Sequence, residues 1–293
     1  MRMYSAVVAA LSAAALCNPA GAASRYSMPW QLRPAAAATA LRADTAVAVS
    51  DPQTTAATML LGSWQVAPNL APFLRLGVVS NSPDQGDGAT ILVNPAFGAT
   101  YAAALRDDVK LALFLGLTAP VGQGGGNSPD AAMAPTRNAG ILARSAMDNA
   151  MFAVNDFTVF PGVGLAWVAY ELTLQVEATL LQLTRVRGED VQPDSSKTNF
   201  TSGVHAGYFI VPIMSLGMDL RYQRWLSTPA AVDADPTGTL RDNATIAVGP
   251  RFHFAMGDAG WLRPGISYTH PLDDPMSANG YRIVQIDLPF VFK

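Results

Sequence analysis

Apolar and polar residues alternate along most of this chain. In VKLALFLGLT, residues 109–118, Val and Leu occupy every second position, and Lys, Ala, Phe, Gly and Thr lie between them. ELTLQVEATL (171–180) and YRIVQIDLPFVFK (281–293) show the same period of two. This period places alternate side chains on opposite faces of a β-strand, whereas a helix would put the charges among the leucines. The pattern therefore predicts strands with one apolar face.

Such windows recur along the chain and predict about twelve strands. They cover residues 40–49, 55–67, 70–80, 89–103, 108–118, 156–169, 171–185, 199–211, 214–226, 242–256, 261–270 and 281–292. The links between them alternate between tight turns, such as LRDD (105–108), and long loops, such as RGEDVQPDSSK (187–197). An even number of strands joined by this alternation is typical of bacterial outer-membrane barrels. The predicted fold class is all-β, a transmembrane antiparallel up-and-down β-barrel of about 12 strands.

Composition supports a membrane surface. Hydrophobic residues make up 50% of the 293 residues and charged residues 14%, whereas soluble domains carry about 25% charged residues. No window reaches the ~18 consecutive apolar residues of a transmembrane helix, and the other structure that satisfies every backbone group in lipid is a closed barrel. The net charge is −3 and no basic cluster occurs. The expected partner is the lipid bilayer, and nucleic acid is not expected.

The N-terminal region predicts export. Residues 1–23 contain Arg2, an apolar stretch from Ala6 to Leu16 and small residues before the expected cleavage site, as a signal peptide does. Cys17, the only cysteine, lies within it, so the mature chain has no disulfide. Residues 24–38 are rich in Pro and Ala and are expected to form a periplasmic arm. Residues 39–293 form the expected barrel of the cell outer membrane, with a long loop at 119–155.

Aromatic residues recur near one end of alternate strands, always on the apolar face. Amphipathic rings at that level form the girdle of a membrane barrel, where they contact the lipid headgroups. The predicted girdle consists of Trp64, Tyr101, Trp167, Tyr208, Phe254 and Phe292.

The final strand, QIDLPFVF, resembles the C-terminal recognition signal of outer-membrane β-barrel proteins. The resemblance covers the signal peptide, the layout of strands and loops, and the last strand at 281–292. It implies a porin-like or transporter-like member of the Gram-negative outer-membrane barrels, with the barrel-assembly machinery as partner. The chain departs from the family pattern because Lys293 follows the terminal aromatic residue.

Charged residues on the strands are predicted to face the lumen, because a charge on the lipid face costs about 2–4 kcal/mol at the midplane. Two interpretations are open: a polar pore that passes small solutes, or a salt-bridged lumen in a non-conducting structural or surface-binding barrel. Inward glycines, among them Gly203, Gly207 and Gly265, favour some open space. The predicted pore-lining residues are Arg75, Lys110, Glu177, Asp219, Arg221, Arg251, His253 and Asp287.

The remaining features of the sequence are the long loop and the residues that could carry chemistry. A short helix is expected at 137–149, either folded into the barrel mouth or lying across it as a lid. The outward faces carry no Ser–His pair, and two inward histidines without a third ligand make a poor metal site. GQGGG lacks the Lys-Ser/Thr that follows a phosphate-binding loop. The sequence therefore predicts no catalytic residues, no metal and no cofactor.

Overall fold

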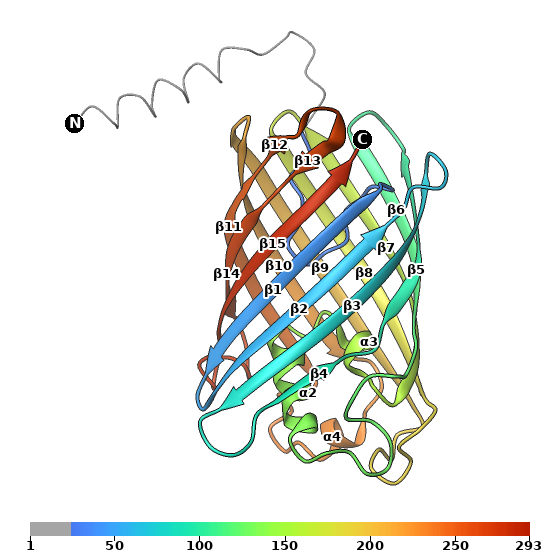
Figure 1. Cartoon of the computed structure of the whole chain (residues 1–293), viewed down its shortest axis with the longest axis vertical. Helices are drawn as coiled ribbons and strands as arrows, with labels where there is room; N and C mark the ends of the chain where they lie inside the picture. The colour runs from blue at the N-terminus through green and yellow to red at the C-terminus, as the bar shows by residue number, and fades with distance from the viewer. Residues whose placement is uncertain (1–24) are drawn as a thin grey trace, which may run out of the picture.

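The computed structural model describes residues 25–293 and shows a closed antiparallel β-barrel of twelve staves (Figure 1). The signal peptide predicted for residues 1–23 lies outside the described residues. Closure comes from the pairing of the first and last strands, in which Ala40 lies opposite Val291 and Asp44 opposite Asp287. The uninterrupted strands are β1 (Ala40–Ser50), β2 (Gln53–Ser63), β3 (Leu70–Pro83), β6 (Val109–Thr118), β7 (Asp156–Ala169), β8 (Leu172–Arg185), β9 (Ser196–Val211), β10 (Met214–Trp225) and β15 (Arg282–Phe292).

The remaining staves are each built from two short strands. These are β4 (Ala89–Leu92) with β5 (Ala96–Ala104), β11 (Asp242–Phe252) with β12 (Phe254–Ala255), and β13 (Gly260–Leu262) with β14 (Gly265–Pro271). Pro95 and Pro264 lie at two of the breaks, where a residue without an N–H interrupts the ladder. The Arg263 N–H still donates to the Pro289 carbonyl at 2.8 Å, and the Phe252 N–H donates to the Pro264 carbonyl at 2.8 Å. The wall is therefore continuous across this break.

The predicted fold class and strand number are confirmed. Most strand ends agree with the predicted windows within three residues. The largest difference is in the second stave, predicted at 55–67, where β2 spans Gln53–Ser63. Short turns join the strands at one end of the barrel, called here the turn end. The long loops lie at the other, the loop end, together with the two-residue turn between β1 and β2. Figure 1 shows the C-terminus at the turn end.

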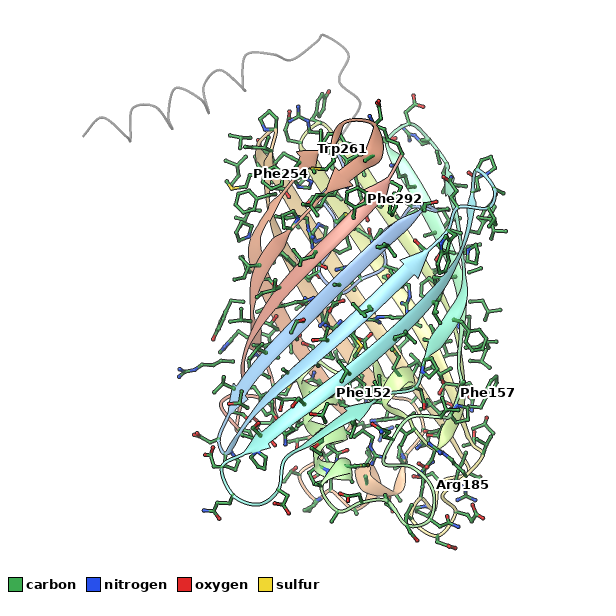
Figure 2. All side chains as sticks on the ribbon, in the orientation of Figure 1. Phe152, Phe157, Arg185, Phe254, Trp261 and Phe292 are labelled. Atoms are coloured by element: carbon green, nitrogen blue, oxygen red, sulfur yellow. The ribbon has the colours of Figure 1, made fainter. Side chains whose placement is uncertain are left out.

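The outer surface is apolar along the strands. In β6, Leu113 and Leu115 are 45% and 52% exposed, whereas Phe114 between them is buried. The six predicted girdle aromatics all lie on this outer surface. Figure 2 shows Phe254 and Phe292 at the turn end, together with Trp261, which the prediction missed. That these rings contact headgroups stays a prediction.

Helices occur only in the loops of the described chain. They are α2 (Met133–Ala143), α3 (Asn149–Phe152) and α4 (Ala230–Asp233), with a 3-10 turn at Gly257–Ala259. None of the helices in residues 25–293 has the length and apolar character needed to cross a membrane. The helix expected at 137–149 instead begins at Met133 and is interrupted at Ser145 and Ala146, both at φ 53°.

The long loop folds into the barrel mouth. α2 and α3 lie inside the loop end (Figure 1), where Met151 and Phe152 of α3 are almost fully buried against Val79, Phe114 and other wall residues. Of the two arrangements expected for this loop, the structure therefore shows the inward fold and not the lid.

Candidate functional site: a lumen closed by two chain segments

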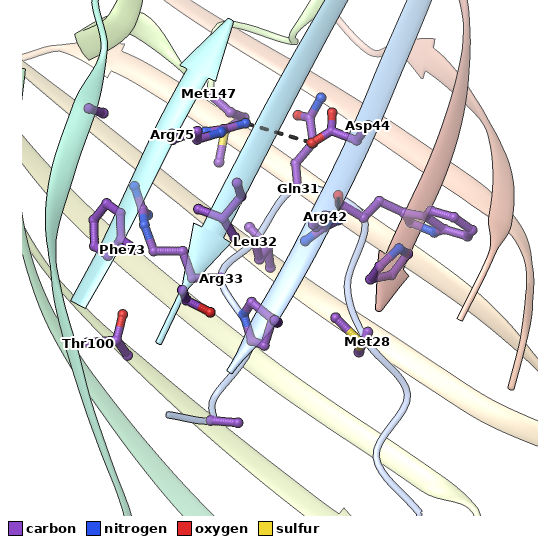
Figure 3. Close-up of a pocket in the computed structure, with 18 of the residues that line it drawn as sticks. Met28, Gln31, Leu32, Arg33, Arg42, Asp44, Phe73, Arg75, Thr100 and Met147 are labelled. Carbon is purple, nitrogen blue, oxygen red and sulfur yellow. Dashed lines mark hydrogen bonds and ion pairs between the residues drawn. The ribbon is translucent and has the colours of Figure 1, made fainter. Parts of the chain in front are cut away.

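Residues 25–39, called here the plug, lie inside the barrel. We expected residues 24–38 to extend into the periplasm, but the described part of this segment runs through the lumen behind the front strands (Figure 3). Trp30 and Leu32 are each 1% exposed, and Met28 is 6% exposed. Apolar side chains of the segment are thus removed from water by entering the barrel. The expectation of a periplasmic arm is corrected accordingly.

The plug occupies space that the wall glycines provide. A Cβ at Gly265 would lie 2.7 Å from the Trp30 ring, and a Cβ at Gly203 would lie 2.5 Å from Leu32 Cδ2. We expected these glycines to leave open space, but their missing side chains admit the plug. A larger residue at these positions would collide with it.

Two acidic residues of the wall hold the plug backbone. Asp219 Oδ2 accepts the N–H of Trp30 at 3.0 Å and that of Gln31 at 3.3 Å. Glu177 accepts the N–H of Arg33 at 2.6 Å and its guanidinium at 2.7 Å. Hydrogen bonds to an ionised carboxylate are stronger than neutral ones, so these acids are the main anchors.

Cations of the wall strands β1 and β11 bind the plug carbonyls. Arg42 contacts the carbonyl of Trp30 and donates to that of Pro29 at 3.2 Å. Arg251 donates to the Met28 carbonyl at 3.2 Å. Both guanidinium groups also bind Asp287, at 2.8 Å and 2.6 Å respectively. The wall therefore binds the plug backbone through both its N–H donors and its carbonyl acceptors.

The loop end is closed by a second set of ion pairs. Arg144, fully buried in the long loop, pairs with Asp44 of β1 and binds Asp148 at 2.8 Å. Asp148 also pairs with Arg75 of β3, whose guanidinium lies 3.9 Å from Asp44. Burial alone would raise the pKa of Asp148, but Arg75 and Arg144 outweigh it and hold that pKa well below its usual range. This four-residue cluster fixes the loop to the wall.

The other predicted pore-lining residues also lie on the inner face. Arg221 is buried but loosely held, since the nearest carboxylate oxygen, on Asp219, is 3.6 Å away. His253 Nε2 lies 2.9 Å from Ser215 Oγ. Lys110 lies over the ring of Tyr26, 5.6 Å from its centroid. The structure thus groups most of the eight around the plug, and Arg75 alone around the loop.

A cavity of about 290 Å³ lies between the two closing segments (Figure 3). The plug forms one side, and wall strands from β15 through β1 to β9 form the rest. Met147, Asp148 and Met151 of the long loop cover its loop end. Most of the lining is apolar, with charged side chains at intervals. It includes Tyr26, Leu32, Arg33, Arg42, Phe73, Arg75, Lys110, Phe160, Leu181 and Arg263.

Sequence reasoning missed the partners of the wall charges. Trp30 and Arg33 come from the plug, and Arg144 and Asp148 come from the long loop. Two signals could have indicated them. Met28, Trp30 and Leu32 alternate with period two, as residues buried on one side do. Arg144 and Asp148 are four apart, a spacing at which opposite charges meet on a helical turn. Within residues 25–293, no cluster of His, Cys, Asp or Glu is arranged to hold a metal ion.

Comparison with known proteins gives a structural match. No family model and no curated protein matches this chain. Its fold is similar to that of the COG4313 outer membrane channel from Pseudomonas putida F1, with 13% identity, a TM-score of 0.57, and coverage of 91% of this chain and 100% of that chain. It is also similar to the NanC porin, with 11% identity, a TM-score of 0.50, and coverage of 86% and 99%. The chain therefore has the fold of outer-membrane β-barrel channels.

Proposed function

We propose that this protein is a gated outer-membrane channel for small solutes, closed in the conformation described here. The observation that carries the proposal is the cavity that lies between two closing segments, neither of which is part of the wall. The plug is held mainly by hydrogen bonds and ion pairs to wall side chains. The long loop is held by ion pairs, by apolar packing of α3 and by a backbone bond from the Asn94 N–H to the Met151 carbonyl at 2.8 Å. The wall is held by continuous backbone pairing. Neither segment contributes a strand to the wall, and we infer that each can move without breaking the backbone pairing of the barrel.

The alternative is a barrel whose salt-bridged lumen serves stability alone. That role needs charges paired within the wall, as Arg42 and Asp287 are. It gives no reason for Asp219 and Glu177 to bind the backbone of a separate segment. The similarity to solved outer-membrane channels supports the channel proposal at the level of the fold.

The test is single-channel conductance of the refolded mature protein in a planar bilayer, compared with a variant that lacks residues 25–38. We expect brief or small currents from the complete chain and larger, longer-lived steps from the deletion. Removal of residues 231–239 from the exposed loop between β10 and β11 is the matched control. Silence from a deletion variant shown to be folded and inserted would rule out the channel.

We also propose that the last strand is read by the barrel-assembly machinery. β15 completes the barrel by pairing with β1, and Phe292 lies exposed on its outer face at the turn end. Phe292→Ala should lower the fraction of chains assembled in the outer membrane, with Val284→Ala as a matched outer-face control. Heat-modifiable mobility in gels measures that fraction, and an equal yield from both variants would contradict this role.

A further inference from the structure

We propose that the cavity between the plug and the barrel wall binds a small organic anion with an apolar body, such as a monocarboxylate that carries an aromatic ring or a short alkyl chain. This inference deepens the proposed function, because it assigns a substrate class to the same lumen. It rests on the charges around the cavity, on their position along its axis and on its size.

Most charges around the cavity are already paired. Arg33 binds Glu177, Arg75 and Arg144 are balanced by Asp44 and Asp148, and Arg42 shares Asp287 with Arg251.

Two cations that line the cavity have no carboxylate within ion-pair distance among the described residues. Lys110 contacts the Tyr26 ring, and Arg263 lies 5.8 Å from the centroid of the Trp261 ring while its buried Nε has no hydrogen-bond partner. Burial of a cation without an anion costs free energy. A bound carboxylate would supply the missing charge and form charge-assisted hydrogen bonds.

The two unpaired cations lie near the same end of the cavity. Lys110 is the second residue of β6, directly after the tight turn at 105–108, and Arg263 follows β13, directly after the turn at 256–259. Both therefore belong to the turn end. Leu32, Phe160 and Leu181 give the cavity an apolar lining. Met147 and Met151 cover its loop end. The geometry orients a ligand with its carboxylate toward the turn end and its apolar part toward the loop end.

The cavity volume limits the ligand size. A cavity of roughly 150 Å³ holds benzene in a protein interior, and this one measures about 290 Å³. It therefore has room for an aromatic ring with a short acidic side chain. A larger polymer or a long-chain lipid does not fit with both closing segments in place.

The experiment measures binding of three probes to the complete mature protein by isothermal titration calorimetry. The probes share one skeleton: 3-phenylpropionate, its neutral amide, and 3-phenylpropylamine. We expect the acid to bind about tenfold more tightly than the amide, and the amine to bind least, because only the acid satisfies the unpaired cations. Lys110→Gln and Arg263→Gln should each weaken binding of the acid about five- to tenfold and leave the amide unchanged.

Arg106→Gln is the matched control, because Arg106 is an exposed cation of the adjacent turn whose loss removes the same charge outside the cavity. Equal affinity for acid and amide, tighter binding of the amine, or the same acid affinity in all variants would overturn the inference. Lack of binding by a protein that conducts ions after plug deletion would overturn the ligand class and leave the channel intact. Selective binding of the acid by a barrel that never conducts would support this site and overturn the channel.

Discussion

At the scale of single residues, the buried carboxylates act as anchors because each serves several donors at once. Asp219 is fully buried, accepts two backbone N–H groups of the plug and lies 2.7 Å from His205 Nδ1. Removal of one partner from a buried charge pair costs about 3–5 kcal/mol, because the other charge stays uncompensated. Substitution of such a carboxylate should therefore destabilise the closed state of the lumen more than the barrel wall, because the backbone pairing of the wall does not depend on this side chain.

Asp219→Asn should open the lumen more often. The amide oxygen can still accept from the plug, but the hydrogen bonds lose their charge assistance, a loss of about 1–2 kcal/mol. We expect about a tenfold rise in the frequency of channel openings in a planar bilayer. Asp87→Asn removes the same charge from an exposed loop and serves as the control. Unchanged opening in Asp219→Asn would show that this carboxylate does not hold the plug.

The pH dependence of the loop closure follows from Asp148. Because its pKa is depressed in the folded chain, the ion pairs contribute stability that is fully present above the ordinary carboxyl pKa of 3.8 and is lost only as pH falls through the lower folded value. We expect channel conductance to be constant from pH 5 to 8. Thermal unfolding, followed by heat-modifiable mobility, should shift toward lower temperature only below about pH 4. Asp148→Asn should remove most of that acid shift, and an equal shift in this variant would assign it to other groups.

At the scale of elements, strands and plug differ in how far sequence predicts them. A strand of the wall can be predicted from its own residues, such as Leu113, Phe114 and Leu115. Lipid on one side and the lumen on the other require its outward and inward side chains to alternate in character. The path of residues 25–39 is decided by contacts with Glu177 and Asp219, more than 130 residues away in the sequence. The alternation of Met28, Trp30 and Leu32 indicates that one side of this segment is buried, but so short a pattern does not indicate which residues it contacts.

Gly265→Ala tests whether the plug depends on the space at the wall glycines. The new Cβ would lie 2.7 Å from the Trp30 ring, and relief of such overpacking typically costs about 1–3 kcal/mol. We expect a shifted plug, seen as an altered tryptophan emission spectrum and more frequent channel opening. Gly164→Ala is the control, since its Cβ would meet no atom closer than 3.7 Å. If both variants behave alike, the plug does not rely on this close contact.

At the scale of the whole molecule, the barrel is a continuous wall around two segments that lie in its lumen, the plug and the long loop. The alternation in the sequence was enough to predict that all eight pore-lining residues, seven of them charged, face inward, because the fold requires charge to be kept away from lipid. The sequence did not indicate which of these residues form ion pairs, because their partners Arg33, Arg144 and Asp148 lie outside the strands. A lumen lined with charge is therefore predictable, whereas the arrangement that closes it depends on tertiary packing.

Two closures along one path should act in series, so that the narrower one limits the current. Arg144→Gln removes the ion pairs that join the long loop to Asp44 and Asp148. With the plug in place, we expect this substitution to change single-channel conductance little. In the variant that lacks residues 25–38, the same substitution should raise conductance several-fold, because the loop then limits the path. An equal effect in both backgrounds would show that the closures lie on separate paths, and Arg106→Gln in each background controls for the loss of a positive charge.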